Sequence, residues 1–142
     1  MKLSANFTLE ELTRSDVAKS RNIDNPPPSY ILPKLSTLAA GLEQIRTLLG
    51  DKPLRITSGY RCFMLNSAIG SKPTSQHITG NAADFVCDAY GAPNEIVKAI
   101  VESDIEYDQI ICEHDAWVHV SFSTRNRQQA LIIDNTGTRS FA

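Results

Sequence analysis

The hydrophobic pattern changes its period near the middle of the chain, and this change limits the folds that are available. Between residues 29 and 50, apolar side chains recur at helical spacing, and Gly50 supplies a stop signal. These side chains are Leu32, Leu35, Leu38, Leu42, Ile45 and Leu49. The second half instead holds short runs that are typical of strands. The runs cover residues 54–57, 82–87, 107–113, 117–122 and 130–134, and a helical pattern returns in residues 93–103.

Two of the strand-like runs follow each other closely. Residues 107–113 and 117–122 are separated by a three-residue segment, 114–116, which favours an antiparallel hairpin. Residues 130–134 are expected to form the last strand. We therefore predict a sheet that is mostly antiparallel.

The beginning of the chain carries a helix-start signal. Thr8 can cap a helix, Glu11 can answer it three residues later, and Phe7 can pack onto Leu12. Together with the long helical stripe, this predicts an α+β fold with helices packed on one face of a mostly antiparallel central sheet. With 142 residues and no internal repeat, the chain is expected to be one domain, residues 1–142, whose core needs no disulfide or metal to be stable.

Charge and hydropathy exclude several classes of protein. The chain has 14 basic and 16 acidic side chains and a net charge of -2, which provides no basic field for nucleic acid. No apolar run approaches the roughly 20 residues of a membrane span, so we expect no membrane insertion. The first residues lack the apolar segment of a secretory signal, so we expect the protein to be cytoplasmic when made, and a monomer.

The three cysteines, Cys62, Cys87 and Cys112, are an odd number and show no CxxC spacing. Packed, reduced thiols are the expected state, although one of them could still act as a soft metal ligand.

The histidines are the residues that most strongly indicate a chemical function. In residues 117–122, strand alternation sends Val118 and Val120 to one face, and Trp117, His119 and Ser121 to the other. Because the valine face suits the core, His119 is expected to line a cleft on the opposite face of the sheet.

A second histidine, His77, lies seven residues before Asp84. On one straight strand they would be more than about 20 Å apart, so they could share an ion only if the chain reverses, and Gly80 with Asn81 allows this. Two imidazoles and one carboxylate are a ligand set for catalytic zinc. Taken alone, each histidine would more often be an ordinary surface or hydrogen-bonding residue.

Several ordered motifs resemble one known family. Residues 58–61, 65–66 and 117–122 accompany an SxHxxGxAxD pattern, which is matched by Ser75, His77, Gly80, Ala82 and Asp84. Residues 6–12 add a further likeness near the start. Together they resemble the zinc D-Ala-D-Ala carboxypeptidases, peptidase family M15, including its carboxypeptidase-like and phage endolysin-like branch. The resemblance implies a hedgehog/DD-peptidase-like fold.

The resemblance also implies roles for individual residues. His77, Asp84 and His119 would hold Zn²⁺, and Arg61 would bind a substrate carboxylate or the developing oxyanion with its planar fork. Ser75 and Trp117 are expected to contact substrate.

The general base is ambiguous in this sequence. Many relatives place an acid three residues before the last histidine, where this chain has Ala116. The alternatives are Glu113, His114 and Asp115. Glu113 is favoured because the hairpin places it on the face of His119, and His114 would then assist the leaving amine. Asp115 is a residue that turns often use for local hydrogen bonds.

Two functions of different class follow. The first is zinc-dependent cleavage of the peptide stems or cross-links of bacterial peptidoglycan, by an endolysin-like endopeptidase that leaves the cell through a phage holin or by a D,D-carboxypeptidase. The alternative is a non-catalytic zinc-fold module for binding or assembly.

Overall fold

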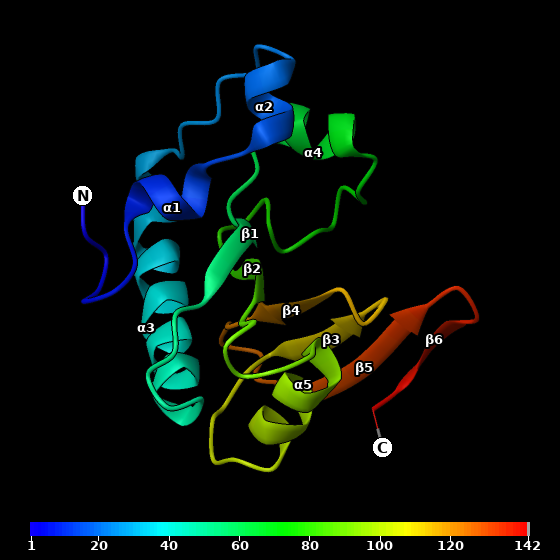
Figure 1. Cartoon of the computed structure of the whole chain (residues 1–142). Coiled ribbons are helices and arrows are strands. Elements are labelled where there is room, and N and C mark those ends of the chain that lie inside the picture. The colour runs from blue at the N-terminus through cyan, green and yellow to red at the C-terminus, as the bar shows by residue number, and fades with distance from the viewer. Residues whose placement is uncertain (142) are drawn as a thin grey trace.

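The computed structural model describes residues 1–141 (Figure 1). Its helical elements are α1 (Leu9–Thr13), α2 (Asp16–Ser20), the 3-10 turn η1 (Ser29–Ile31), α3 (Leu32–Leu48), α4 (Phe63–Ile69) and α5 (Pro93–Val101). Its strands are β1 (Arg55–Ser58), β2 (Ala82–Val86), β3 (Gln109–Glu113), β4 (Trp117–Ser121), β5 (Gln129–Asp134) and β6 (Gly137–Ser140). The predicted hairpin and the long helix are therefore confirmed, with boundaries shifted by a few residues.

The strands form one six-stranded sheet in the order β1-β2-β4-β3-β5-β6. Every pair is antiparallel except β3 with β5, which run parallel. The prediction of a mostly antiparallel sheet in an α+β fold is confirmed. The prediction that residues 130–134 form the last strand is wrong, because β6 follows β5 and pairs with it across a tight turn.

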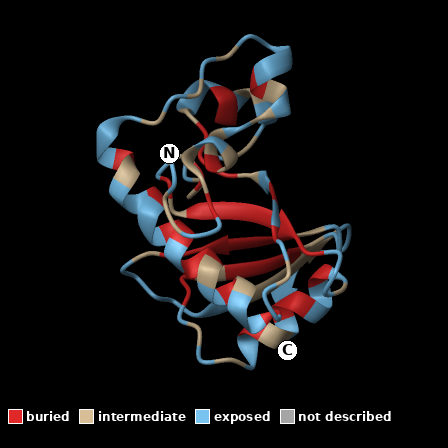
Figure 2. Ribbon diagram, turned by 60° about the vertical axis from the view of Figure 1, so that its left-hand side comes forward, coloured by how far each residue is buried: buried red, intermediate tan, exposed pale blue. Residues whose placement is uncertain are grey.

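The core lies between the sheet and two helices. α5 packs against β3 and β4, and α3 packs against α5, so both cover the same face of the sheet (Figure 1). Val118 and Val120 point into this core and are fully buried, as the alternation predicts. Figure 2 shows the strands as the buried centre and the helices with exposed outer faces. The opposite face of the sheet is left for polar side chains of β2 and β4.

The start of α1 follows the predicted capping pattern. The Thr8 side chain accepts a hydrogen bond from the Glu11 amide, and Phe7 and Leu12 are both buried. Beyond α1, the short helices α2 and α4 lie side by side at the far end of the molecule from α5 (Figure 1).

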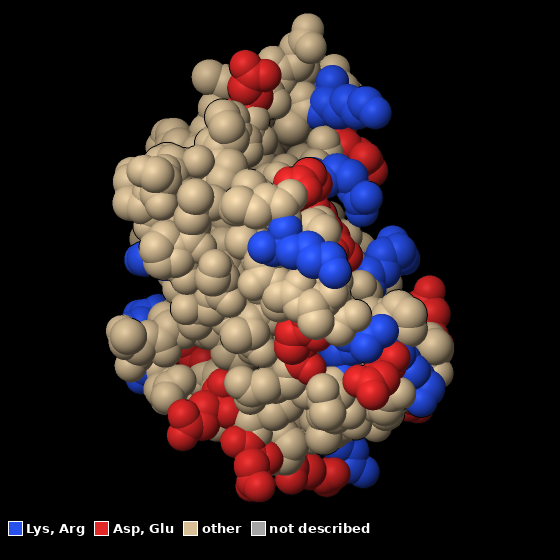
Figure 3. Space-filling model, turned by 90° about the vertical axis from the view of Figure 1, so that its left-hand side faces the viewer, with Lys and Arg blue, Asp and Glu red and all other residues tan. Residues whose placement is uncertain are grey.

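The outer surface carries mixed charge. On the face drawn in Figure 3, basic side chains are scattered among acidic ones, and no broad basic field is visible. Among the described residues, no helix is long and apolar enough to cross a membrane.

Candidate metal centre

The register between β2 and β4 fixes the first two polar side chains. Asp84 is the direct cross-strand partner of His119, so both side chains leave the sheet on the same face. The Nδ1 atom of His119 lies 2.9 Å from Oδ1 of Asp84. The sheet alone therefore brings one imidazole and one carboxylate together, on the face that α3 and α5 leave uncovered.

His77 reaches the same carboxylate from a loop. Its Nε2 atom lies 3.2 Å from Oδ1 of Asp84. The chain reverses as predicted at Gly80, whose φ of +77° suits glycine and whose missing side chain leaves room for Ile31. The backbone amide of Arg61 also donates to the His77 carbonyl at 3.1 Å, which holds the loop against the end of β1.

The second ring nitrogen of His77 determines its tautomer. Nδ1 lies 2.7 Å from the carbonyl oxygen of Gly59, which can only accept, so Nδ1 carries the proton. A side chain on Gly59 would collide with the Leu12 carbonyl, so only glycine fits at this position, where its own carbonyl contacts His77. The neutral ring then turns an Nε2 lone pair toward Asp84, as a metal ligand would.

Burial and charge act together at this cluster. His77, Asp84 and His119 are 3%, 8% and 8% exposed. Burial lowers the pKa of His77, and Asp84 opposes only part of this effect, so the neutral imidazole is favoured. Burial alone would raise the pKa of Asp84, but a proton on a neighbouring imidazole, through attraction and hydrogen bonding, outweighs it and holds that pKa well below its usual range.

These three side chains could hold a metal ion. Their ligand atoms all lie within 4.8 Å of one another. A lone pair on His77 facing an ionised carboxylate is unfavourable unless a cation or proton lies between them. Two imidazoles and one carboxylate are the donor set of catalytic zinc, so the residues fit that ion.

Arg61 lies beside the cluster and is 8% exposed. Its Nε donates to Ser58 Oγ at 3.1 Å, and its Nη1 donates to the buried Asn66 at 3.2 Å. Nη2 is 3.6 Å from Oδ2 of Asp84. The guanidinium is thus fixed at two nitrogens, and its third nitrogen faces the candidate metal centre.

Glu113 ends β3 on the same face of the sheet. It pairs with Trp117, two residues from His119 along β4, so it lies diagonally across from that histidine. Burial raises the pKa of Glu113, and the negative charge of Asp84 raises it further. Among the described residues, no hydrogen bond or ion pair engages this carboxylate.

His114 and Trp117 lie at the hairpin turn. Their ring centroids are 5.8 Å apart, and His114 is exposed. The Trp117 Nε1 is buried without a hydrogen-bond partner in the described part of the chain. His114 and Asp115 have φ values of 54° and 48°, in the left-handed region, which His and Asp adopt more often than most residues other than glycine.

The Asp115 side chain contacts the first turn of α5. Its Oδ1 accepts from the Asn94 amide at 3.1 Å, and its Oδ2 lies 3.4 Å from the Asn94 side-chain nitrogen. The residue at the N-cap position, Ala92, offers no side-chain acceptor of its own. Asp115 therefore caps α5 from the hairpin and ties the turn beside Glu113 to that helix.

The remaining candidates have mainly structural contacts. The Ser75 hydroxyl accepts from the His77 amide at 3.2 Å, so it stabilises the loop that presents the histidine. The predicted free thiols are confirmed, and among residues 1–141 no cysteine joins the group that could hold a metal.

Two further residues at the centre, Gly59 and Asn66, were given no role from the sequence, although both lie in motifs shared with the resembled family. Their contacts to His77 and Arg61 cross loops that no local pattern predicts.

The cap formed by Asp115 gives a testable difference between two variants. Asp115→Ala should lower the free energy of unfolding by about 1 kcal/mol, because the Asn94 amide loses its acceptor. Asp115→Asn should retain most of the stability, since its amide oxygen still accepts. Urea unfolding of the two variants measures the difference. An Asp115→Ala protein as stable as wild type would show that Asp115 does not cap α5.

Comparison with known proteins gives the family. The zinc D-Ala-D-Ala carboxypeptidase of Streptomyces albus G is 36% identical over 50 residues, which are 35% of this chain. The matched segment spans only 20% of that relative's length. The sequence model of the family Peptidase M15 matches residues 5–121, a range that contains the whole candidate metal centre. The chain therefore belongs to the Peptidase M15 family.

Proposed function

We propose that the chain is a zinc-dependent peptidase that cleaves peptide stems or cross-links of bacterial peptidoglycan. The observation that carries the proposal is the convergence of the ligand atoms of His77, Asp84 and His119 within 4.8 Å of one another, in a buried cluster beside Arg61. Membership of the Peptidase M15 family and the name of the Streptomyces albus G relative supply the substrate class. In this proposal, residues 1–142 act as one catalytic domain.

The metal would be held by His77 Nε2, a carboxylate oxygen of Asp84 and His119 Nδ1. When bound, zinc lowers the pKa of a coordinated water to about 7 and polarises the scissile carbonyl. The protein fixes the three ligands before substrate arrives, because Gly59 orients one imidazole and the β2–β4 register orients the other.

Arg61 and Glu113 act on the substrate side of the centre. The Nη2 end of Arg61 would receive a substrate carboxylate or the developing oxyanion, with Ser58 and Asn66 keeping the guanidinium in position. Glu113, whose pKa is raised by burial, would accept the proton during attack and return it to the leaving amine. His114 and Trp117 would lie on the leaving-group side of the metal centre.

The proposal is tested with defined muropeptides. Protein loaded with one zinc per chain should release new peptide fragments, and chelation should stop the release until zinc is restored. Mass spectrometry of the products separates new internal amino termini, which indicate an endopeptidase, from release of terminal D-Ala. The double variant His77→Ala/His119→Ala serves as the control, since it should bind no zinc and release nothing. Tight zinc binding by that variant would contradict the assigned site, and zinc-loaded wild-type protein that leaves every muropeptide intact would favour a non-catalytic module.

Arg61 should not be replaceable by lysine. Arg61→Lys should lower kcat/KM by about 10- to 100-fold, because an ammonium is a point charge that lacks the fork geometry. Zinc content should stay at the wild-type level, since Arg61 is not a ligand. Wild-type kinetics in Arg61→Lys would show that only a positive charge is needed there.

Glu113 should be the side chain on which turnover depends most among the three candidate bases. Glu113→Gln should keep the fold and the zinc but lower kcat by about 10²- to 10⁴-fold, because the amide cannot accept the proton. His114→Ala, measured at the same zinc occupancy, should have a smaller effect. An inactive His114→Ala protein together with an active Glu113→Gln protein would move the role to His114.

A further inference from the structure

A buried carboxylate outside the candidate metal centre gathers an unusual number of hydrogen bonds. Asp108 is fully buried. It directly precedes β3 and lies beside Ser121, the last residue of β4. Its Oδ1 accepts from the Arg127 amide and Nε at 3.1 and 2.8 Å. Its Oδ2 accepts from Arg127 Nη2 at 3.0 Å, from Arg125 Nη2 at 3.3 Å, and from Gln76 Nε2 at 2.8 Å. The forked bonds from Arg127 hold the pKa of Asp108 well below its usual range, so it remains an ionised anchor.

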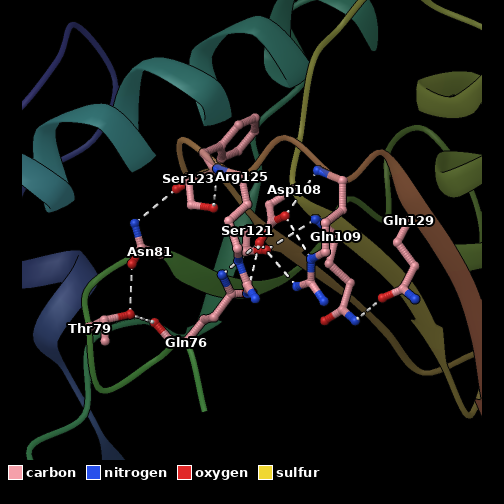
Figure 4. A network of polar contacts seen from close by, with 11 residues as sticks. Gln76, Thr79, Asn81, Asp108, Gln109, Ser121, Ser123, Arg125 and Gln129 are labelled. Carbon is pink, nitrogen blue, oxygen red and sulfur yellow. Dashed lines mark hydrogen bonds and ion pairs between the residues drawn. The ribbon is translucent and has the colours of Figure 1, made fainter. Parts of the chain in front are cut away.

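The backbone of Asp108 ties this anchor to the strand of His119. Its amide donates to the Ser121 carbonyl at 2.8 Å, and the neighbouring Gln109 amide donates to the Ser121 hydroxyl at 3.1 Å. Figure 4 shows Asp108 at the centre of these contacts, with Gln76 reaching it from the loop below. Ser121 is two residues from His119 on β4, so Asp108 is fixed relative to that histidine.

The contact from Gln76 gives the network a connection to the metal loop. Gln76 directly precedes His77, and the two residues lie in a loop outside the sheet. The Gln76 side chain is hydrogen-bonded to Asp108, and the Asp108 backbone is hydrogen-bonded to Ser121 on β4. This link therefore constrains the distance between the imidazoles of His77 and His119. The ring centroids of His77 and His119 are 5.1 Å apart.

We propose that Gln76, bound to the Asp108–Arg127 pair, is a positioning residue that sets His77 at the distance from His119 that zinc binding requires. The inference rests on the proposed role of His77 and His119 as zinc ligands. Partners of this indirect kind typically change metal affinity by 10- to 100-fold when removed. Gln76 would act through His77 and would not touch the metal itself.

Gln76 is the residue to change, because Asp108 cannot be tested cleanly. Removing Asp108 would leave Arg127 without its partner and could unfold the protein. Without Gln76, by contrast, Asp108 still accepts four hydrogen bonds, three from Arg127 and one from Arg125. Gln76→Met preserves the length of the side chain but replaces its amide with an apolar thioether, and Gln76→Ala removes the length as well. The matched control is Gln129→Ala, which breaks the exposed Gln109–Gln129 bond at the edge of the same network.

The test measures zinc affinity by competition with a chromophoric chelator, and the melting temperature of the metal-free protein. Gln76→Met and Gln76→Ala should each weaken zinc binding by about 10-fold or more, while their metal-free melting temperatures match that of Gln129→Ala. Their Co²⁺ absorption spectra should also differ from the wild-type spectrum, because the ligand geometry is altered. The control should keep wild-type zinc affinity and spectrum.

Two results would overturn the inference. If both Gln76 variants bind zinc within twofold of wild type, the link does not position His77, and the proposed function stands. If the wild-type protein binds no zinc, the proposed function fails, and this inference fails with it.

Discussion

The antiparallel register between β2 and β4 is the constraint on which the candidate metal centre depends. It sets Asp84 directly opposite His119, with the flanking Ala83, Val118 and Val120 buried in the core. A slip of one residue in either strand would send its polar side chain into that core and its apolar neighbours to the open face. The free energy of burying the apolar face therefore also enforces the position of the Asp84–His119 pair.

His77 completes the cluster by a different route. It comes from a loop, so its position depends on individual contacts rather than on a ladder of backbone hydrogen bonds. Gly59 fixes the proton on one ring nitrogen, and the turn at Gly80 brings the loop back to β2. Glycine is needed at both places, at Gly59 for close approach and at Gly80 for its positive φ. This dependence on single contacts explains why a link such as Gln76 to Asp108 can matter for metal affinity.

Short sequence patterns correctly predicted the features that depend on neighbouring residues. Alternation in residues 117–122 gave the direction of the His119 side chain, and the capping pattern at Thr8 gave the start of α1. The roles of the site residues came from the family resemblance and remain predictions. The parallel pairing of β5 with β3, the extra strand β6 and the cap that Asp115 provides for α5 were not predicted. Each depends on contacts between segments distant in sequence, which no short window contains.

The most direct test is anomalous diffraction at the zinc edge from crystals of the zinc-loaded protein. We expect one strong peak about 2.0–2.2 Å from His77 Nε2, His119 Nδ1 and an oxygen of Asp84, with Arg61 beside it. A peak held by other side chains, or no peak at these three residues in zinc-loaded crystals, would contradict the assignment of this cluster as the catalytic centre.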